Sequence, residues 1–301
     1  MSLPQPNGHG AQTPPLPAQP PLAQTAFGYP RDFLGNRFVY TVISPRAGGL
    51  SIGLNLNPDG QCNFDCVYCE VNRALLPRDT QLDVEVMAQE LVQTLQMAYE
   101  GRLRERPAYR HLPKELLEVR HVAFSGDGEP TLCSQFAQAV QAVVHVRALG
   151  RFPFFKMVLI TNATALDAPA VKEGLKFFTA QDEVWAKLDA GTQAYMDLVD
   201  KPQLPLERVL ENILALGRSR PVVIQSLFLQ MNNQEPPPEE IDAYAQRLKE
   251  LKDAGAQIPL VQVYSATRPF QHPECQHLPL KALSRIAQRV RKVAGLRAEV
   301  F

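Results

Sequence analysis

Residues 62–69 have the sequence Cys62-Asn63-Phe64-Asp65-Cys66-Val67-Tyr68-Cys69. Three thiolates on one short loop can bind three irons of an iron–sulfur cube and leave the fourth iron open. Four cysteines close the shell of an ordinary electron-transfer cluster, so this loop predicts a cluster that binds a further ligand. The alternative is a zinc site, which needs a fourth ligand from Cys133, Cys275 or a histidine. A disulfide framework is disfavoured, because the chain has five cysteines, an odd number.

The spacing Cys-x-x-x-Cys-x-x-Cys, with the aromatic Tyr68 before its last cysteine, resembles the signature of the radical S-adenosylmethionine (radical SAM) enzymes. The resemblance implies that Cys62, Cys66 and Cys69 hold a [4Fe–4S] cluster and that SAM chelates the open iron, with Tyr68 at the cofactor site. It also implies reductive cleavage of SAM to a 5′-deoxyadenosyl radical, which abstracts hydrogen from an unidentified substrate. A flavodoxin or ferredoxin is the implied electron donor.

The composition limits the possible partners. The chain has 31 basic and 31 acidic residues and a formal net charge of zero, so no global attraction to nucleic acid or to an anionic membrane is expected. No apolar run approaches the roughly 20 residues needed to span a bilayer. With 45% hydrophobic residues in 301, one large domain can form. Free cysteines and an oxygen-sensitive cluster motif predict a cytoplasmic protein.

The sequence also predicts how the chain is divided into segments and where its two remaining cysteines lie. Residues 1–25, rich in Pro and Gln, are expected to form a disordered tail, and residues 26–301 a radical SAM core domain with terminal extensions. Cys133 is expected to be a buried small residue. Cys275 lies near His272 and His277, where a metal site is conceivable but a plain surface loop is favoured.

From residue 26 onward, apolar runs alternate with helical patterns, which predicts repeated βα units and a parallel sheet. The expected strands are 50–56, 119–124, 155–160, 183–188, 222–229 and 260–264, and the expected helices are 82–100, 134–149, 168–178, 205–216, 238–254 and 281–294. These units predict an α/β fold, a partial (β/α)6 barrel of the radical SAM type. Right-handed crossovers place all strand carboxyl ends, and with them the cysteine loop, on one rim. The aromatics of residues 27–46 are expected to cover a barrel end.

The second expected strand leads into the run Ser125-Gly126-Asp127-Gly128-Glu129-Pro130-Thr131. Radical SAM enzymes carry a Gly-Gly-Glu-type motif at this position, and this form, with Asp127 inserted, resembles the subgroup of tRNA wyosine-base synthase-like iron–sulfur oxidoreductases. The resemblance assigns Gly128 and Glu129 to the methionine ammonium of SAM and makes Gly126 a further cofactor-binding residue. A tight turn with a helix-capping acid is the alternative.

Later strand ends carry further polar candidates. The resemblance makes Asn162 and Asp189 candidates for the SAM ribose and Lys187 for its carboxylate or for the substrate. A structural Lys187–Asp189 salt bridge is the alternative. Arg268 follows the last expected strand, where a guanidinium suits a carboxylate or phosphate, although an ordinary surface arginine would need no explanation.

The favoured function is therefore a radical SAM enzyme of unidentified substrate. If Lys187 and Arg268 both face the lumen, a small anionic molecule or a phosphorylated nucleotide fits best. One alternative is a tRNA base-modifying enzyme, for which the 281–292 helix, with Arg285, Arg289 and Arg291, offers a basic face. The other is a metal-binding scaffold without turnover.

Overall fold

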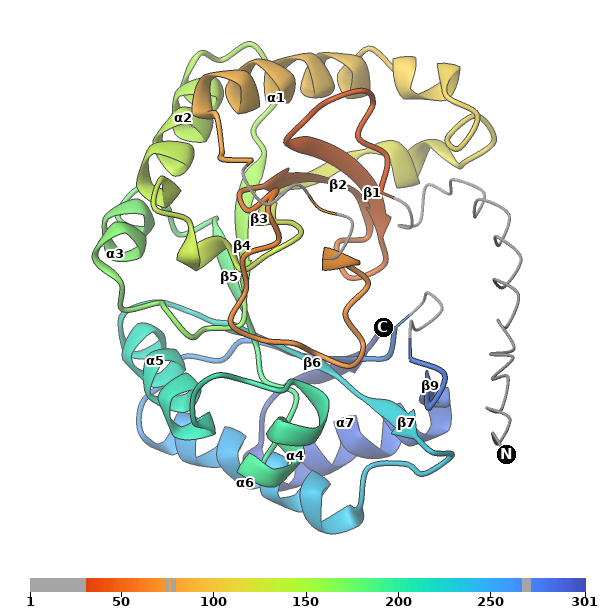
Figure 1. Cartoon of the computed structure of the whole chain (residues 1–301), viewed down its shortest axis with the longest axis vertical. Coiled ribbons are helices and arrows are strands. Elements are labelled where there is room, and N and C mark those ends of the chain that lie inside the picture. The colour runs from red at the N-terminus through yellow and green to blue at the C-terminus, as the bar shows by residue number, and fades with distance from the viewer. Residues whose placement is uncertain (1–30, 74–75, 77–79, 267–271) are drawn as a thin grey trace, which may run out of the picture.

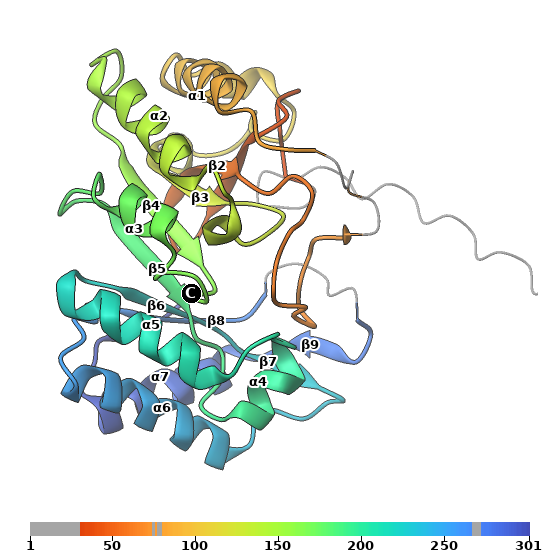
Figure 2. The same ribbon diagram turned by 60° about the vertical axis from the view of Figure 1, so that its left-hand side comes forward.

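The computed structural model describes residues 31–73, 76, 80–266 and 272–301. The tail expected over residues 1–25, and Arg268, lie outside these residues. The described chain folds around an eight-stranded sheet of order β1-β2-β3-β4-β5-β6-β8-β10, which is parallel from β2 to β10 and carries β1 as an antiparallel edge. The sheet curls into a half-barrel, and the helices lie along its convex face (Figure 1, Figure 2). The predicted partial barrel is confirmed.

The element bounds follow the predicted βα units closely. The strands are β1 (Val39–Ser44), β2 (Gly49–Asn55), β3 (Val119–Ser125), β4 (Lys156–Thr161), β5 (Glu183–Lys187), β6 (Val223–Leu227), β7 (Leu229–Met231), β8 (Val261–Tyr264), β9 (Cys275–His277) and β10 (Ala298–Val300). The α-helices are α1 (Val84–Tyr99), α2 (Phe136–Ala148), α3 (Pro169–Leu175), α4 (Gln193–Val199), α5 (Leu206–Ser219), α6 (Pro238–Asp253) and α7 (Leu280–Ala294). Short 3₁₀ helices are η2 (Arg102–Glu105), η3 (Lys114–Leu117) and η4 (Pro130–Leu132). Among the described residues, no helix combines the length and apolar character needed to cross a membrane.

Side-chain alternation divides the sheet into a face packed under the helices and a face that lines the lumen. Val122 and Phe124 of β3 point outward into the main core beneath the helices. Ala123 of the same strand points into the lumen, where it clusters with Val158 and Trp185. Because successive strand residues face opposite sides, each parallel strand contributes both to the helix-covered core and to the lumen wall.

Two regions differ from the expectations. Within the segment expected to cover a barrel end, residues 39–44 instead form β1, and Tyr40 packs over Gly53, where any Cβ would overlap its ring. Residues 39–44 are rich in β-branched residues (Val39, Thr41, Val42 and Ile43), which suit a strand. The single strand expected over 222–229 is divided at Phe228: β6 ends at Leu227, and the chain then pairs as β7 with β9.

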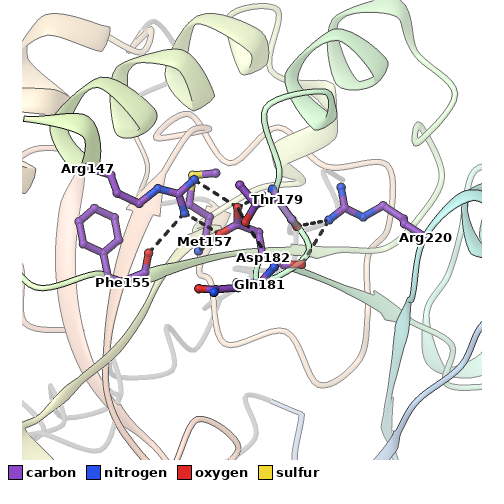
Figure 3. Close-up of polar contacts among 7 residues, drawn as sticks. All are labelled: Arg147, Phe155, Met157, Thr179, Gln181, Asp182 and Arg220. Carbon is purple, nitrogen blue, oxygen red and sulfur yellow. Dashed lines mark hydrogen bonds and ion pairs between the residues drawn. The ribbon is translucent and has the colours of Figure 1, made fainter.

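Asp182 ties the amino-terminal ends of β4 and β5 to the helices (Figure 3). Its fully buried carboxylate accepts from both terminal nitrogens of Arg147, at 2.8 and 3.3 Å, and from the backbone N–H of Met157, at 2.7 Å. Thr179 adds its backbone N–H at 2.8 Å and its hydroxyl at 2.9 Å. Burial alone would raise the pKa of Asp182, but these donors lower it below its usual value. This network fixes the barrel end opposite the cysteine loop.

Candidate cofactor and substrate site

The cysteine loop follows β2 and lies at the carboxyl end of the sheet, as predicted. Two backbone hydrogen bonds attach it to the end of α4: Asp65 N–H donates to the Asp200 carbonyl at 3.0 Å, and Val67 N–H to the Val199 carbonyl at 2.9 Å. The Arg73 guanidinium also donates to the Phe64 carbonyl at 2.8 Å. The contacts of Asp65 and Val67 therefore attach the loop to residues more than 130 positions away in the sequence.

The glycine motif at the end of β3 holds the start of this loop. A Cβ at Gly128 would overlap the Gln61 carbonyl oxygen, the same oxygen that accepts from Glu129 N–H at 2.8 Å. Gly126 has a φ of +143° and lies against Asn55, where a side chain would also collide. The two glycines thus permit close backbone approach between the motif and the residue before Cys62.

Glu129 is 4% exposed and joins the ends of β3 and β4. Its Oε1 accepts from Thr131 N–H and from the Thr131 and Thr161 hydroxyls, the hydroxyls both at 2.6 Å. Its Oε2 accepts from Asn162 N–H at 2.7 Å. Burial raises the pKa of Glu129 above its usual value, while these donors oppose the rise. The capping alternative is observed, since Glu129 caps η4, and the assignment to the SAM ammonium stays a prediction.

Asn162 contacts the cysteine loop directly. Its Nδ2 donates to Asn63 Oδ1 at 2.8 Å and lies 3.9 Å from Cys62 Sγ. This contact places an amide donor beside a cluster ligand, and burial raises the pKa of the free Cys62 thiol. The role of Asn162 toward the SAM ribose stays a prediction.

Beneath the loop, Tyr68 joins two buried carboxylates. Its hydroxyl contacts Asp189 Oδ2 and, at 2.6 Å, Asp200 Oδ1. Burial and the neighbouring Asp189 carboxylate raise the pKa of Asp200 to about 8, and a proton on Asp200 lets both contacts be hydrogen bonds. Asp189 Oδ1 also accepts from Leu227 N–H at 2.7 Å. The sequence does not predict Asp200 as a site residue, because it lies 132 positions from Tyr68 and belongs to no motif.

Lys187 lies beside this cluster as a paired cation. Its Nζ is 3.1 Å from Asp189 Oδ2 and 4.9 Å from the centroid of the Tyr68 ring. Burial alone would lower the pKa of Lys187, but Asp189, Tyr264 and other acidic groups raise it above its usual value. The salt-bridge alternative is therefore observed. Lys187 therefore stays protonated, so it can bind an anion but cannot act as a proton acceptor.

A cavity of about 580 Å³ runs from the cysteine loop into the lumen. The predicted residues Tyr68, Cys69, Gly126 and Lys187 line it, whereas Glu129, Asn162 and Asp189 lie in the supporting wall. Sequence reasoning missed several lining residues: Arg31, Tyr40, Arg46, Ser51, His121 and Tyr264. Arg31 pairs with Asp127, and Asn55 Nδ2 donates to Asp127 Oδ2 at 2.5 Å. The Asp inserted into the glycine motif thus anchors the segment before β1 at the cavity mouth.

The cysteines suit an iron–sulfur cube better than a single ion. Among the described residues, no three Cys, His, Asp or Glu side chains converge as ligands of one metal ion would. A cube does not require such convergence, because each of its cysteines binds a different iron. Cys133 is buried, as expected. Cys275 is also buried, in β9 under the cysteine loop and not in a surface loop, and its Sγ faces the Val67 carbonyl at 3.9 Å.

The fold and this loop together define a half-barrel iron–sulfur protein, and comparison with known proteins gives its family. The Radical SAM superfamily model matches residues 56–243, more than half of the chain, so the protein belongs to the radical SAM superfamily. A UPF0026 protein of Helicobacter pylori strain J99 is 28% identical over 185 residues, which are 60% of this chain and 52% of that protein. The chain thus spans about half the length of the curated relatives it matches.

Two solved structures share the fold. A radical SAM methyltransferase from Sphaerobacter thermophilus superimposes with a TM-score of 0.59 at 15% identity, covering 87% of this chain and 68% of that one. TYW1 with a lysine-pyruvate adduct bound gives a TM-score of 0.56 at 14% identity, covering 85% and 84%. The predicted family and fold are confirmed, and the cofactors are a [4Fe–4S] cluster and SAM. When bound, the cluster supplies the electron that cleaves SAM reductively.

Proposed function

We propose that this protein is a radical SAM enzyme whose substrate is a small molecule bound in the barrel lumen. The observation that carries the proposal is the continuous cavity of about 580 Å³, which begins at Cys69 and Gly126 and extends inward to Trp185 and His121. Its volume falls within the roughly 300–1,000 Å³ typical of small-molecule sites. A hydrogen atom of a substrate held there would face the cofactor side of the lumen.

The alternative substrate, tRNA, is less well supported by the charged surface. In α7, the helix predicted to offer a basic face, Arg285 pairs with Glu235, and Arg289 with Asp242 at 2.6 Å. Arg291 donates to the Ala298 carbonyl at 2.6 Å. Two of the three arginines are therefore neutralised by carboxylates on the protein, and counterion release on phosphate binding requires uncompensated cations.

The electron donor is inferred from the chemistry of the family. Radical SAM enzymes need a reductant, and we infer a flavodoxin or ferredoxin. The five cysteines are free, which suits a reducing compartment such as the cytoplasm. Of these, Cys62, Cys66 and Cys69 are the proposed cluster ligands.

The test is substrate-stimulated SAM cleavage. Anaerobically reconstituted protein is incubated with SAM, dithionite and either the small-molecule fraction or the tRNA fraction of a cell extract, and 5′-deoxyadenosine is quantified. We expect the small-molecule fraction to stimulate its formation and the tRNA fraction to have no effect. Cys66→Ala is the inactive control and Cys275→Ala the matched cysteine control. Stimulation by tRNA alone would establish the tRNA-modifying alternative instead.

A further inference from the structure

We propose that Arg46 anchors an anionic oxygen group, a carboxylate or a phosphate, of the substrate in the barrel lumen. This inference rests on the proposed small-molecule function and adds the chemical class that the site selects. Arg46 lies in the turn between β1 and β2 and lines the cavity. Its Cζ is 4.0 Å from the centroid of the Tyr264 ring. Because β1 and β8 lie near opposite ends of the sheet, this contact crosses the open side of the half-barrel.

The charge balance of the cavity singles out Arg46. The other lining cations have carboxylate partners: Arg31 pairs with Asp127, and Lys187 with Asp189 at 3.1 Å. The Nε of Arg46 is buried and has no hydrogen-bond partner among the described residues, and no carboxylate of those residues pairs with its guanidinium. An unpaired buried donor is unfavourable, so a ligand anion would supply the missing partner. The planar guanidinium fork suits carboxylate or phosphate oxygens.

His121 provides a second polar atom in the same wall. Its side chain is 1% exposed, and its Nε2 is 2.8 Å from Ser51 Oγ. Its Nδ1 is buried without a partner among the described residues. Burial, together with the charges of Lys156 and Arg46, lowers the pKa of His121 to about 3, so the ring is neutral. With the Ser51 hydroxyl donating to Nε2, the Nδ1 proton can donate to the same anion.

The position of these groups orients the substrate. His121 precedes Ser125 on β3 by four residues. At about 3.3 Å per residue, this separation is roughly 13 Å along the strand. Ala123, Val158 and Trp185 form an apolar wall beside it. The anionic end would therefore lie deep in the lumen, with the organic body extending along the apolar wall toward the cysteine loop.

Fluorescence of the single tryptophan gives a direct test, because Trp185 lines the cavity. The reconstituted, SAM-bound full chain is titrated with inorganic phosphate or with succinate at constant ionic strength. Arg46→Gln is compared with Arg289→Gln, which removes an equal charge from the surface of α7. A second cavity of about 910 Å³ at the amino ends of the strands shares Arg46 and Trp185, so Lys172→Gln, which affects only that cavity, is the second control.

We expect at least one probe to bind, and Arg46→Gln to weaken it about tenfold or more, as for loss of a charge-assisted contact. Both controls should bind within about twofold of wild type. The stronger probe distinguishes a phosphate from a carboxylate group. If Arg46→Gln does not fold, Arg46→Lys decides, since loss of the planar fork should weaken binding.

Three results would overturn the proposal: no binding of either probe, wild-type affinity in folded Arg46→Gln or Arg46→Lys, or an equal loss in Lys172→Gln. Formation of 5′-deoxyadenosine by the wild type tests the proposed function separately, because the fluorescence titration requires no turnover.

Discussion

Replacement of Glu129 by glutamine should separate cofactor binding from structural support. The carboxylate accepts from Thr131 and Thr161 on one oxygen and from Asn162 N–H on the other. An amide places an NH₂ group against at least one of these donors, in either orientation. One buried donor left unsatisfied costs about 1–3 kcal/mol. If Glu129 also contacts the SAM ammonium, loss of its charge should raise the SAM dissociation constant about tenfold or more.

Thr161→Val is the matched control, since it removes one donor to Glu129 and keeps the carboxylate. Because the Thr161 hydroxyl also accepts from the buried Ala163 N–H at 2.9 Å, the variant should reduce the free energy of unfolding by about 1–3 kcal/mol. Its SAM affinity should stay within about threefold of wild type. Urea unfolding and equilibrium SAM binding to the reconstituted protein measure the two quantities. A Glu129→Gln protein that binds SAM as tightly as Thr161→Val would refute the assignment and leave Glu129 a purely structural cap.

Further predictions concern stability. Asp182→Ala leaves the buried Arg147 guanidinium without its carboxylate and should cost about 3–5 kcal/mol in urea unfolding. Asp253→Ala, which removes the exposed ion pair with Lys249, should leave the urea midpoint unchanged. An equal loss of stability in the two variants would contradict the structural role of the Asp182 network. His121 is protonated near pH 6.5 in the unfolded chain but only near 3 when folded, so its contribution is present above pH 6.5 and lost as pH falls toward 3. At about 1.4 kcal/mol per pH unit, the loss of stability between pH 6.5 and 3 that is due to His121 is at most about 5 kcal/mol. His121→Leu should therefore make the free energy of unfolding depend less on pH in this range. If the free energy of unfolding of the variant and the wild type changed in parallel with pH, this role of His121 would be excluded. Tyr68→Phe removes the hydroxyl between Asp189 and Asp200 and should cost about 1–3 kcal/mol by thermal or urea unfolding, an expectation that wild-type stability would contradict.

Much of the fold was predictable because local patterns determine it. The βα alternation gave the central parallel strands, and their side-chain alternation correctly placed Lys187 toward the lumen. The cysteine spacing and the glycine motif identified a loop and a strand end that do meet, through Gln61 and Gly128. In each case the information lies within a few adjacent residues.

The missed residues depend on contacts between distant segments. Arg46 reaches the lumen only because the edge strand β1 turns its loop toward Tyr264, more than 200 positions later. Asp200 belongs to the site because its carboxylate contacts the Tyr68 hydroxyl. His121 belongs to it because the fold places Ser51, 70 positions earlier, beside its ring. A single sequence contains no local pattern for such pairings.

Transfer of a hydrogen atom from a small anionic molecule to the SAM-derived 5′-deoxyadenosyl radical, which becomes 5′-deoxyadenosine, is the most direct test of the proposed activity. Extract from cells grown in deuterated medium is divided into anionic small molecules, other small molecules and RNA, and each fraction is incubated with reconstituted protein, unlabelled SAM and reductant. Mass spectrometry should detect deuterium in the 5′-deoxyadenosine formed with the anionic small-molecule fraction. The Arg46→Gln enzyme should incorporate less deuterium than the wild type, and the Arg289→Gln enzyme the same amount. Deuterium acquired only from the RNA fraction would contradict the account.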